Sequence, residues 1–297
     1  MSSLSLVVLF LLGCAFGSFV NVLTLRFEPL GKFFSSRVVR GRSRCMSCKR
    51  QLRWFELVPL VSFVAQKGKC RSCRERLSWQ YLLVELVGGL LFVFVPLALR
   101  SFFVVWNPAW GLLTVSFLSA LWVAVFVLLL IVIIVDMRHF IIPNGINALL
   151  ALLGVVWVLA IWRLGVFDVF YGGSFLQHYA ALLPSPIGGG VLSYVFGALA
   201  GVIFFGLLVF LSRGRAMGMG DVKLIGALGL LFGWPDILLI IILSFLLGAL
   251  VSVVLMLRGT KTLSDRVPFG PFIVLAATIV FFCGAGLMGA YFGIIGM

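Results

Sequence analysis

Seven stretches of this chain are apolar over a length that can cross a lipid bilayer. A membrane-spanning helix needs about 20 apolar residues, because the hydrocarbon core is about 30 Å thick. A soluble domain could not bury this much apolar surface, since 63% of the residues are hydrophobic and only 11% are charged. The sequence therefore predicts an all-α polytopic membrane protein. The stretches lie at 4–25, 81–99, 111–135, 142–162, 188–211, 236–257 and 271–295.

An eighth apolar stretch, at 222–234, is shorter than the others. Its 13 residues are too few for a straight span. We expect it to be a half-helix or a helix that its glycines lengthen. With it, the chain has about eight transmembrane helices.

The basic residues are distributed unevenly among the loops. If Met1 lies outside the cell, the loops that face inward hold 21 of the 23 Lys and Arg residues. This asymmetry follows the positive-inside rule and supports eight spans with both termini outside. It also accounts for the net charge of +14 without a nucleic-acid partner, because the basic loops then face the anionic inner leaflet of the lipid bilayer.

One polar, basic insert interrupts the apolar pattern. Residues 1–25 are expected to form the first transmembrane helix, 26–80 a cytoplasmic insert, and 81–297 the remaining transmembrane domain. Two Cys-x-x-Cys pairs in the insert predict a tetrahedral, structural zinc site. So short an insert builds little core, and a metal would supply folding free energy. Redox-active or unpaired thiols are the alternative. The predicted ligands are Cys45, Cys48, Cys70 and Cys73.

Three of the nine acidic residues, Glu85, Asp136 and Asp221, lie at or inside apolar segments, where acids usually mark a functional site. Asp136 closes the third span and Asp221 opens the short eighth stretch, so both are expected at the inner membrane boundary. Two carboxylates that meet there would share a proton, as in aspartic proteases, where one activates water and the other acts as an acid. Alternatively, each aspartate caps a helix.

Four further residues are candidates for substrate binding. Gly218 and Gly220 permit positive φ and leave room for a substrate backbone. Lys223 could bind a substrate carboxylate, although a basic anchor at the membrane surface needs no such role. Glu85 could pair with a cation of the insert or with a substrate amine, and a structural pairing is the alternative.

Several motifs resemble those of the type IV prepilin peptidases, which belong to the GxGD membrane aspartyl proteases. The similar segments follow one another from about residue 10 to 275 and are GSFVNVLTLR, the paired Cys-x-x-Cys insert, LSWQYLLVE, DMRHFIIPN, GMGDVKL and VPFGPF. The resemblance implies that Asp136 and Asp221 cleave the basic leader of prepilins or pseudopilins at the cytoplasmic face of the bacterial inner membrane. For members with this insert, it also implies zinc binding by the cysteines and methylation of the new N-terminus with S-adenosylmethionine.

Other interpretations stay open at this point. The protein could be a peptidase without methyltransferase activity. It could also be a transporter, because intramembrane carboxylates serve proton and cation paths, or a non-enzymatic adaptor whose zinc module binds a partner.

Overall fold

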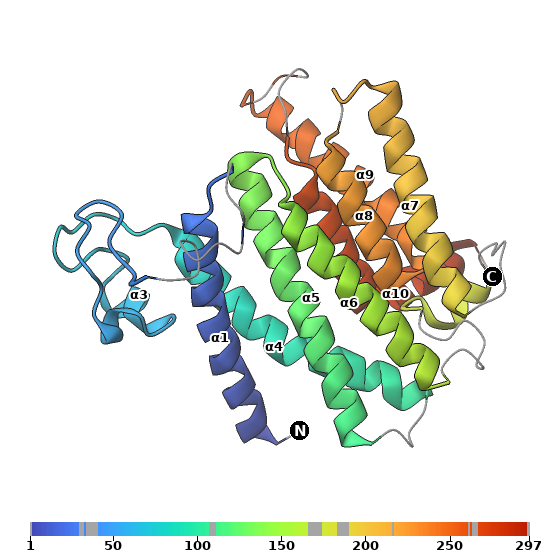
Figure 1. The fold of residues 1–297 in the computed structure, drawn as a ribbon, viewed down its shortest axis with the longest axis horizontal. Coiled ribbons are helices and arrows are strands. Elements are labelled where there is room, and N and C mark those ends of the chain that lie inside the picture. Colours follow the sequence, from blue (N-terminus) through green and yellow to red (C-terminus); the bar gives the residue numbers. More distant parts are fainter. Residues whose placement is uncertain are drawn as a thin grey trace. The chain divides into compact units, whose positions relative to one another are not determined.

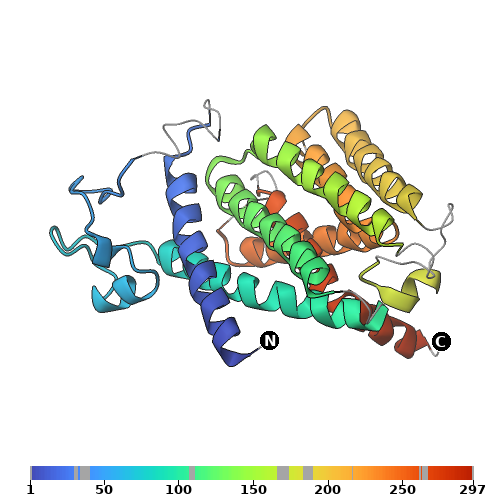
Figure 2. The same cartoon turned by 60° about the horizontal axis from the view of Figure 1, so that its bottom comes forward.

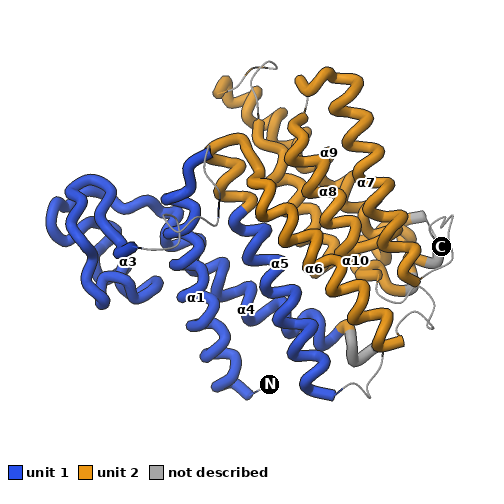
Figure 3. The backbone as a smooth tube through the Cα atoms, viewed as in Figure 1, with its two compact units in different colours: residues 1–101, 110–131 blue, residues 102–109, 132–297 orange. Residues whose placement is uncertain are grey.

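The computed structural model describes residues 2–29, 33, 41–106, 111–165, 174–182, 190–215, 217–260, 262 and 267–295. Regular secondary structure in this part of the chain is helical throughout. The chain forms two compact units, one of residues 1–101 and 110–131, the other of residues 102–109 and 132–297 (Figure 3).

Seven helices of the described residues are long and apolar enough to cross a membrane, which confirms the predicted polytopic all-α fold. They are α1 (Ser3–Arg26), α4 (Trp79–Trp106), α5 (Leu112–His139), α6 (Asn144–Arg163), α7 (Val191–Leu211), α9 (Asp236–Leu257) and α10 (Gly270–Ile295) (Figure 1). The expected shorter segment is α8 (Met219–Phe232), whose 14 residues extend only about 21 Å. The remaining elements are η1 (Trp54–Glu56), α3 (Val61–Ala65) and η3 (Gln177–Leu182).

In the first unit, α1 and α4 pack backbone against backbone. A Cβ atom on Gly13 would come 2.4 Å from the carbonyl oxygen of Gly88, and one on Gly17 would come 2.6 Å from that of Val84. Small residues at these positions let two membrane helices approach closely. The pair α1 and α4 thus carries the insert on a rigid base, because the insert connects the end of α1 to the start of α4.

In the second unit, α8 is the central helix. It contacts α6, α7, α9 and α10, and both views show it among these helices (Figures 1 and 2). Ten of its 14 residues are buried. Glycines make this packing possible, since a Cβ on Gly229 would come 2.5 Å from the Cα of Ala198 on α7.

The end of α8 is held by buried hydrogen bonds from the segments around it. Asp236, the first residue of α9, is fully buried, and its carboxylate accepts hydrogen bonds from the Ser174 hydroxyl at 2.5 Å and the Phe175 N–H at 2.7 Å. The Ser193 hydroxyl of α7 donates to the Trp234 carbonyl oxygen at 2.6 Å. The turn from α8 to α9 is therefore fixed on both sides, at the end of α8 opposite to Asp221.

Candidate functional site

Asp136 lies in the last turn of α5 and is buried, with 5% of its surface exposed. Its Oδ2 atom accepts a hydrogen bond of 3.0 Å from the backbone N–H of Gly270, the first residue of α10. The helix ends immediately afterwards, because Phe140 adopts a φ of 55° and donates its N–H to the Asp136 carbonyl oxygen. That left-handed conformation is unfavourable for a residue with a side chain as large as phenylalanine.

Asp221 lies in the first turn of α8 and is also buried, with 8% of its surface exposed. Its Oδ2 atom accepts a hydrogen bond of 3.2 Å from the N–H of Gly218, the N-cap residue. The carboxylate therefore closes the first turn from the third helical position, whereas the capping interpretation of the sequence placed Asp221 at the N-cap, which Gly218 occupies. Its negative charge is favourable at a helix N-terminus. This hydrogen bond uses the Oδ2 atom of the carboxylate and does not involve the Oδ1 atom.

The two aspartates belong to the same unit, and their helix ends converge. Ile142 packs against both helix starts, since a Cβ on Gly220 would lie 3.2 Å from the Ile142 Cβ and one on Gly270 would lie 3.3 Å from its Cδ1. Two buried carboxylates from different helices, each bonded to a backbone N–H group, therefore belong to helix ends that meet at Ile142.

The two glycines before Asp221 do not use the conformation that the sequence suggested. Gly218 has a φ of −89°, and Gly220 is not among the glycines with positive φ. The expectation of positive φ is therefore wrong. Instead, the absence of a side chain at Gly220 lets α8 start tightly against Ile142, so close packing explains that glycine.

Two asparagines of α6 hold the start of α8. The Lys223 ammonium donates a hydrogen bond of 2.8 Å to Asn144 Oδ1, and the Asn147 side-chain amide donates one of 3.2 Å to the Gly220 carbonyl oxygen. Lys223 is thus engaged by a neutral partner at the surface. Asn147 fixes the peptide bond that precedes Asp221, a role that the sequence did not suggest.

Glu85 lies in α4 and belongs to the first unit. It is buried, and its Oε2 atom accepts a hydrogen bond of 2.8 Å from the backbone N–H of Leu60 in the insert. This contact ties the insert to α4, as the structural interpretation of Glu85 expected.

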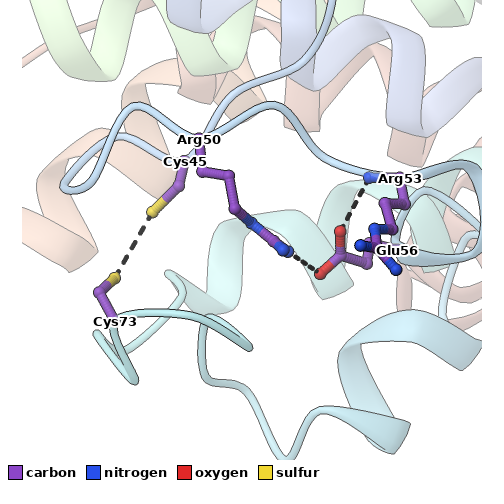
Figure 4. Close-up of polar contacts among 5 residues, drawn as sticks. All are labelled: Cys45, Arg50, Arg53, Glu56 and Cys73. Carbon is purple, nitrogen blue, oxygen red and sulfur yellow. Dashed lines mark hydrogen bonds and ion pairs between the residues drawn. The ribbon is translucent and has the colours of Figure 1, made fainter.

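The four cysteine sulfurs form a compact cluster in the first unit. All four lie within 4.8 Å of one another, and the sulfurs of Cys45 and Cys73 are 3.8 Å apart (Figure 4). A regular tetrahedron with Zn–S bonds of about 2.3 Å has sulfurs about 3.8 Å apart. The cluster therefore fits the predicted four-thiolate zinc site.

The two Cys-x-x-Cys pairs have the same backbone structure, which we call the two knuckles (residues 43–52 and 68–77). In each, the first cysteine donates its N–H to a carbonyl oxygen five residues later, at 3.0 Å for Cys45 and 2.8 Å for Cys70. In each, the residue after the second cysteine has positive φ, 57° at Lys49 and 55° at Arg74. The sequences RCMSCKRQL and KCRSCRERL carry this repeat, which the sequence analysis missed.

A partly buried ion pair supports the first knuckle. Glu56 accepts a hydrogen bond from the Arg50 guanidinium at 2.6 Å and one from the Arg53 N–H at 2.8 Å (Figure 4). Arg50 is in the knuckle, whereas Glu56 ends η1. The pair therefore joins the first knuckle to the segment that follows it.

Comparisons with known proteins agree with this arrangement. The chain matches the Bacterial Peptidase A24 N-terminal domain at residues 11–99 and the Type IV leader peptidase family at residues 122–253. A prepilin leader peptidase/N-methyltransferase of Stutzerimonas stutzeri is 29% identical over 301 residues, which cover 94% of this chain and 91% of the relative. The protein of the same name from Pseudomonas aeruginosa PAO1 is 27% identical over 305 residues, covering 95% and 91%. No solved structure matches the chain.

Each of the two family matches contains one of the two candidate sites. The N-terminal match contains the insert with its four clustered sulfurs, and the second match contains Asp136 and Asp221. Relatives align along nearly the whole chain. This protein therefore belongs to the type IV leader peptidase family.

Proposed function

We propose that this protein is a membrane aspartyl endopeptidase that removes the leader of type IV prepilins or pseudopilins and then methylates the new N-terminus. The observation that carries the proposal is the buried pair Asp136 and Asp221, on two helices of one unit whose ends converge on Ile142. Family membership and the names of the relatives support the peptidase and methyltransferase activities.

In the proposed reaction, one carboxylate of the pair is ionised and the other protonated. The ionised group takes a proton from water as the water oxygen attacks the scissile carbonyl carbon, and the protonated group donates a hydrogen bond to the carbonyl oxygen. The tetrahedral intermediate then expels the leaving amine, which takes up the proton that the first carboxylate received from water. The N–H groups of Gly270 and Gly218 orient the two carboxylates. Gly218, Gly220 and Lys223 border the pair and are proposed to contact substrate.

The position of the pair favours a peptidase over a transporter. Asp136 is in the last turn of its helix and Asp221 in the first turn of its own, whereas transporter sites gather near the middle of the bilayer. A non-enzymatic adaptor would use the cysteine insert but would have no need for two buried acids at converging helix ends.

Two cofactors are proposed for this protein, zinc and S-adenosylmethionine. Cys45, Cys48, Cys70 and Cys73 would hold zinc, whose role is structural because four cysteines leave no open coordination position. S-adenosylmethionine is the methyl donor that the relatives' names suggest. We assign no residues to this cofactor.

The test is incubation of purified protein with a prepilin peptide, followed by mass spectrometry. We expect loss of the leader and, with S-adenosylmethionine present, a further gain of one methyl group on the shortened product. Leader loss without the methyl gain would indicate a peptidase that lacks methyltransferase activity. An intact peptide after incubation with folded protein would contradict the proposal.

Seven apolar helices and the family indicate a multi-pass protein of the bacterial inner membrane, and we propose that the aspartates face the cytoplasm. Gly111 and Arg258, both exposed and at helix ends, test this orientation. In a Cys283→Ser background, Gly111→Cys should react with an impermeant maleimide from outside, and Arg258→Cys only from inside. Labelling of both positions from one side would refute the orientation.

Gly270→Ala should impair cleavage while leaving the fold intact. The added Cβ would lie 2.7 Å from Asp136 Oδ2, so the carboxylate must move. Displacement of a catalytic group by about 1 Å can cost about 10²-fold in rate. The matched control is Gly286→Ala in the same helix, where a Cβ meets nothing within 4 Å. Similar cleavage rates for the two variants would argue against a role for the Gly270 contact.

A further inference from the structure

The insert exposes apolar side chains in a segment that we call the apolar edge (residues 54–64). Trp54 is 79% exposed, Val61 63% and Val64 67%, and Leu57 and Val58 are exposed to a smaller extent. Val61 and Val64 are three residues apart on α3 and therefore lie on one side of that short helix. A contiguous run of this kind on a small, polar module marks an interaction surface.

Two contacts fix the position of the apolar edge along the axis of α4. The ring of Phe63 lies 5.6 Å from that of Trp79, the first residue of α4. The N–H of Leu60 bonds to Glu85, which is six residues further into α4 and hence about 9 Å along its axis. Because α4 is a membrane-length helix, the apolar edge runs beside its first two turns, where lipid headgroups meet the acyl chains.

The polar part of the insert is basic and exposed. Cations near a membrane surface are attracted to anionic lipids, and tryptophan is favoured at the interface because its ring has an apolar body and a polar N–H. Two acids lie at the apolar edge, and both are buried: Glu56 pairs with Arg50, and Glu85 accepts the hydrogen bond from Leu60. Among the residues of the insert that the structure describes, the exposed basic ones are Arg42, Arg44, Lys49, Arg53, Lys67, Lys69, Arg71, Arg74 and Arg76.

We propose that the apolar edge is an interfacial membrane anchor, which inserts Trp54, Val61 and Val64 among anionic lipids beside α4. The occupant is lipid rather than protein, because the contacts with Trp79 and Glu85 hold the edge at headgroup depth and the surrounding charge is positive. The insert then lies on the bilayer surface and does not extend freely into the solvent. This inference goes beyond peptide cleavage and does not depend on it.

Photo-crosslinking in the full-length, zinc-loaded protein tests the anchor. A benzophenone amino acid is placed at Val61, at Val64 or, as a control, at Ser47, an exposed polar residue of the first knuckle. In nanodiscs that contain phosphatidylglycerol, lipid adducts at Val61 and Val64 should exceed those at Ser47 several-fold. They should fall in discs of phosphatidylcholine alone.

A second variant distinguishes insertion of the valines into lipid from crosslinking that results only from proximity to lipid. With benzophenone at Trp54, the double change Val61→Asp and Val64→Asp should reduce the lipid adduct several-fold, whereas Ser47→Asp should not. Zinc content checks that the insert stays folded, which we expect because both valines are exposed.

Three outcomes would overturn the proposal. Lipid adducts at Val61 and Val64 that do not exceed those at Ser47 would show that the apolar edge is not a membrane anchor. Equal adduct yields in neutral and anionic discs would show that lipid charge plays no role. Adducts that form with added prepilin peptide in place of lipid would make the apolar edge a protein-docking surface.

Discussion

Asp136→Asn and Asp221→Asn are each expected to abolish leader cleavage in a protein that is still folded and inserted in the membrane. Loss of general acid–base catalysis costs about 10²–10⁴-fold, and the loss should be larger here because each carboxylate is half of one mechanism. Asparagine keeps the shape of aspartate and one acceptor oxygen, so the bonds from Gly270 and Gly218 can still form. Cleavage of a prepilin peptide, followed by mass spectrometry, measures the effect.

The same variants separate the two activities. Methylation needs no carboxylate pair, and both variants should still methylate a precleaved peptide with a free N-terminus. Glu28→Gln is the matched control, since Glu28 is exposed and its loss should leave cleavage unchanged. Cleavage near the parent rate by either asparagine variant would show that the substituted aspartate is not required for cleavage.

Loss of zinc is expected to unfold the insert while the transmembrane helices stay in place. Structural zinc contributes about 10–16 kcal/mol in small zinc modules, more than the short core of the insert can replace. Protein purified without added metal should contain one zinc per chain by elemental analysis. Cys70→Ser should lower that content and make the insert sensitive to protease.

Cys283→Ser is the control for the zinc prediction, because Cys283 is exposed and lies outside the cluster. It should change neither zinc content nor protease sensitivity. Folded, active protein without zinc would contradict a structural metal.

The fold, the cysteine cluster and the position of the two aspartates at helix ends were largely predictable because they depend on local patterns. Apolar runs of sufficient length specify membrane helices, and the spacing of four cysteines specifies a metal site. The aspartates stand out because an acid at the edge of an apolar run is costly. Each of these signals is contained in a few neighbouring residues.

Contacts between distant residues were not predictable in the same way. Gly270 holds Asp136 from 134 positions away, and Asn147 holds Gly220 from 73 positions away. Asp236 is an ordinary acid after a Trp-Pro turn in the sequence, yet in the fold it is fully buried against Ser174. No local pattern reports which backbone groups such side chains meet, because tertiary packing alone decides it.

The central position of α8 has a consequence for how the protein responds to different bilayers. A helix that faces lipid must match the hydrophobic thickness around it, or tilt and distort to accommodate a mismatch. Ten of the 14 residues of α8 are buried, and its neighbours are α6, α7, α9 and α10. Side-chain packing therefore sets the depth of Asp221, and a thinner or thicker bilayer acts on this carboxylate only through the helices that surround it.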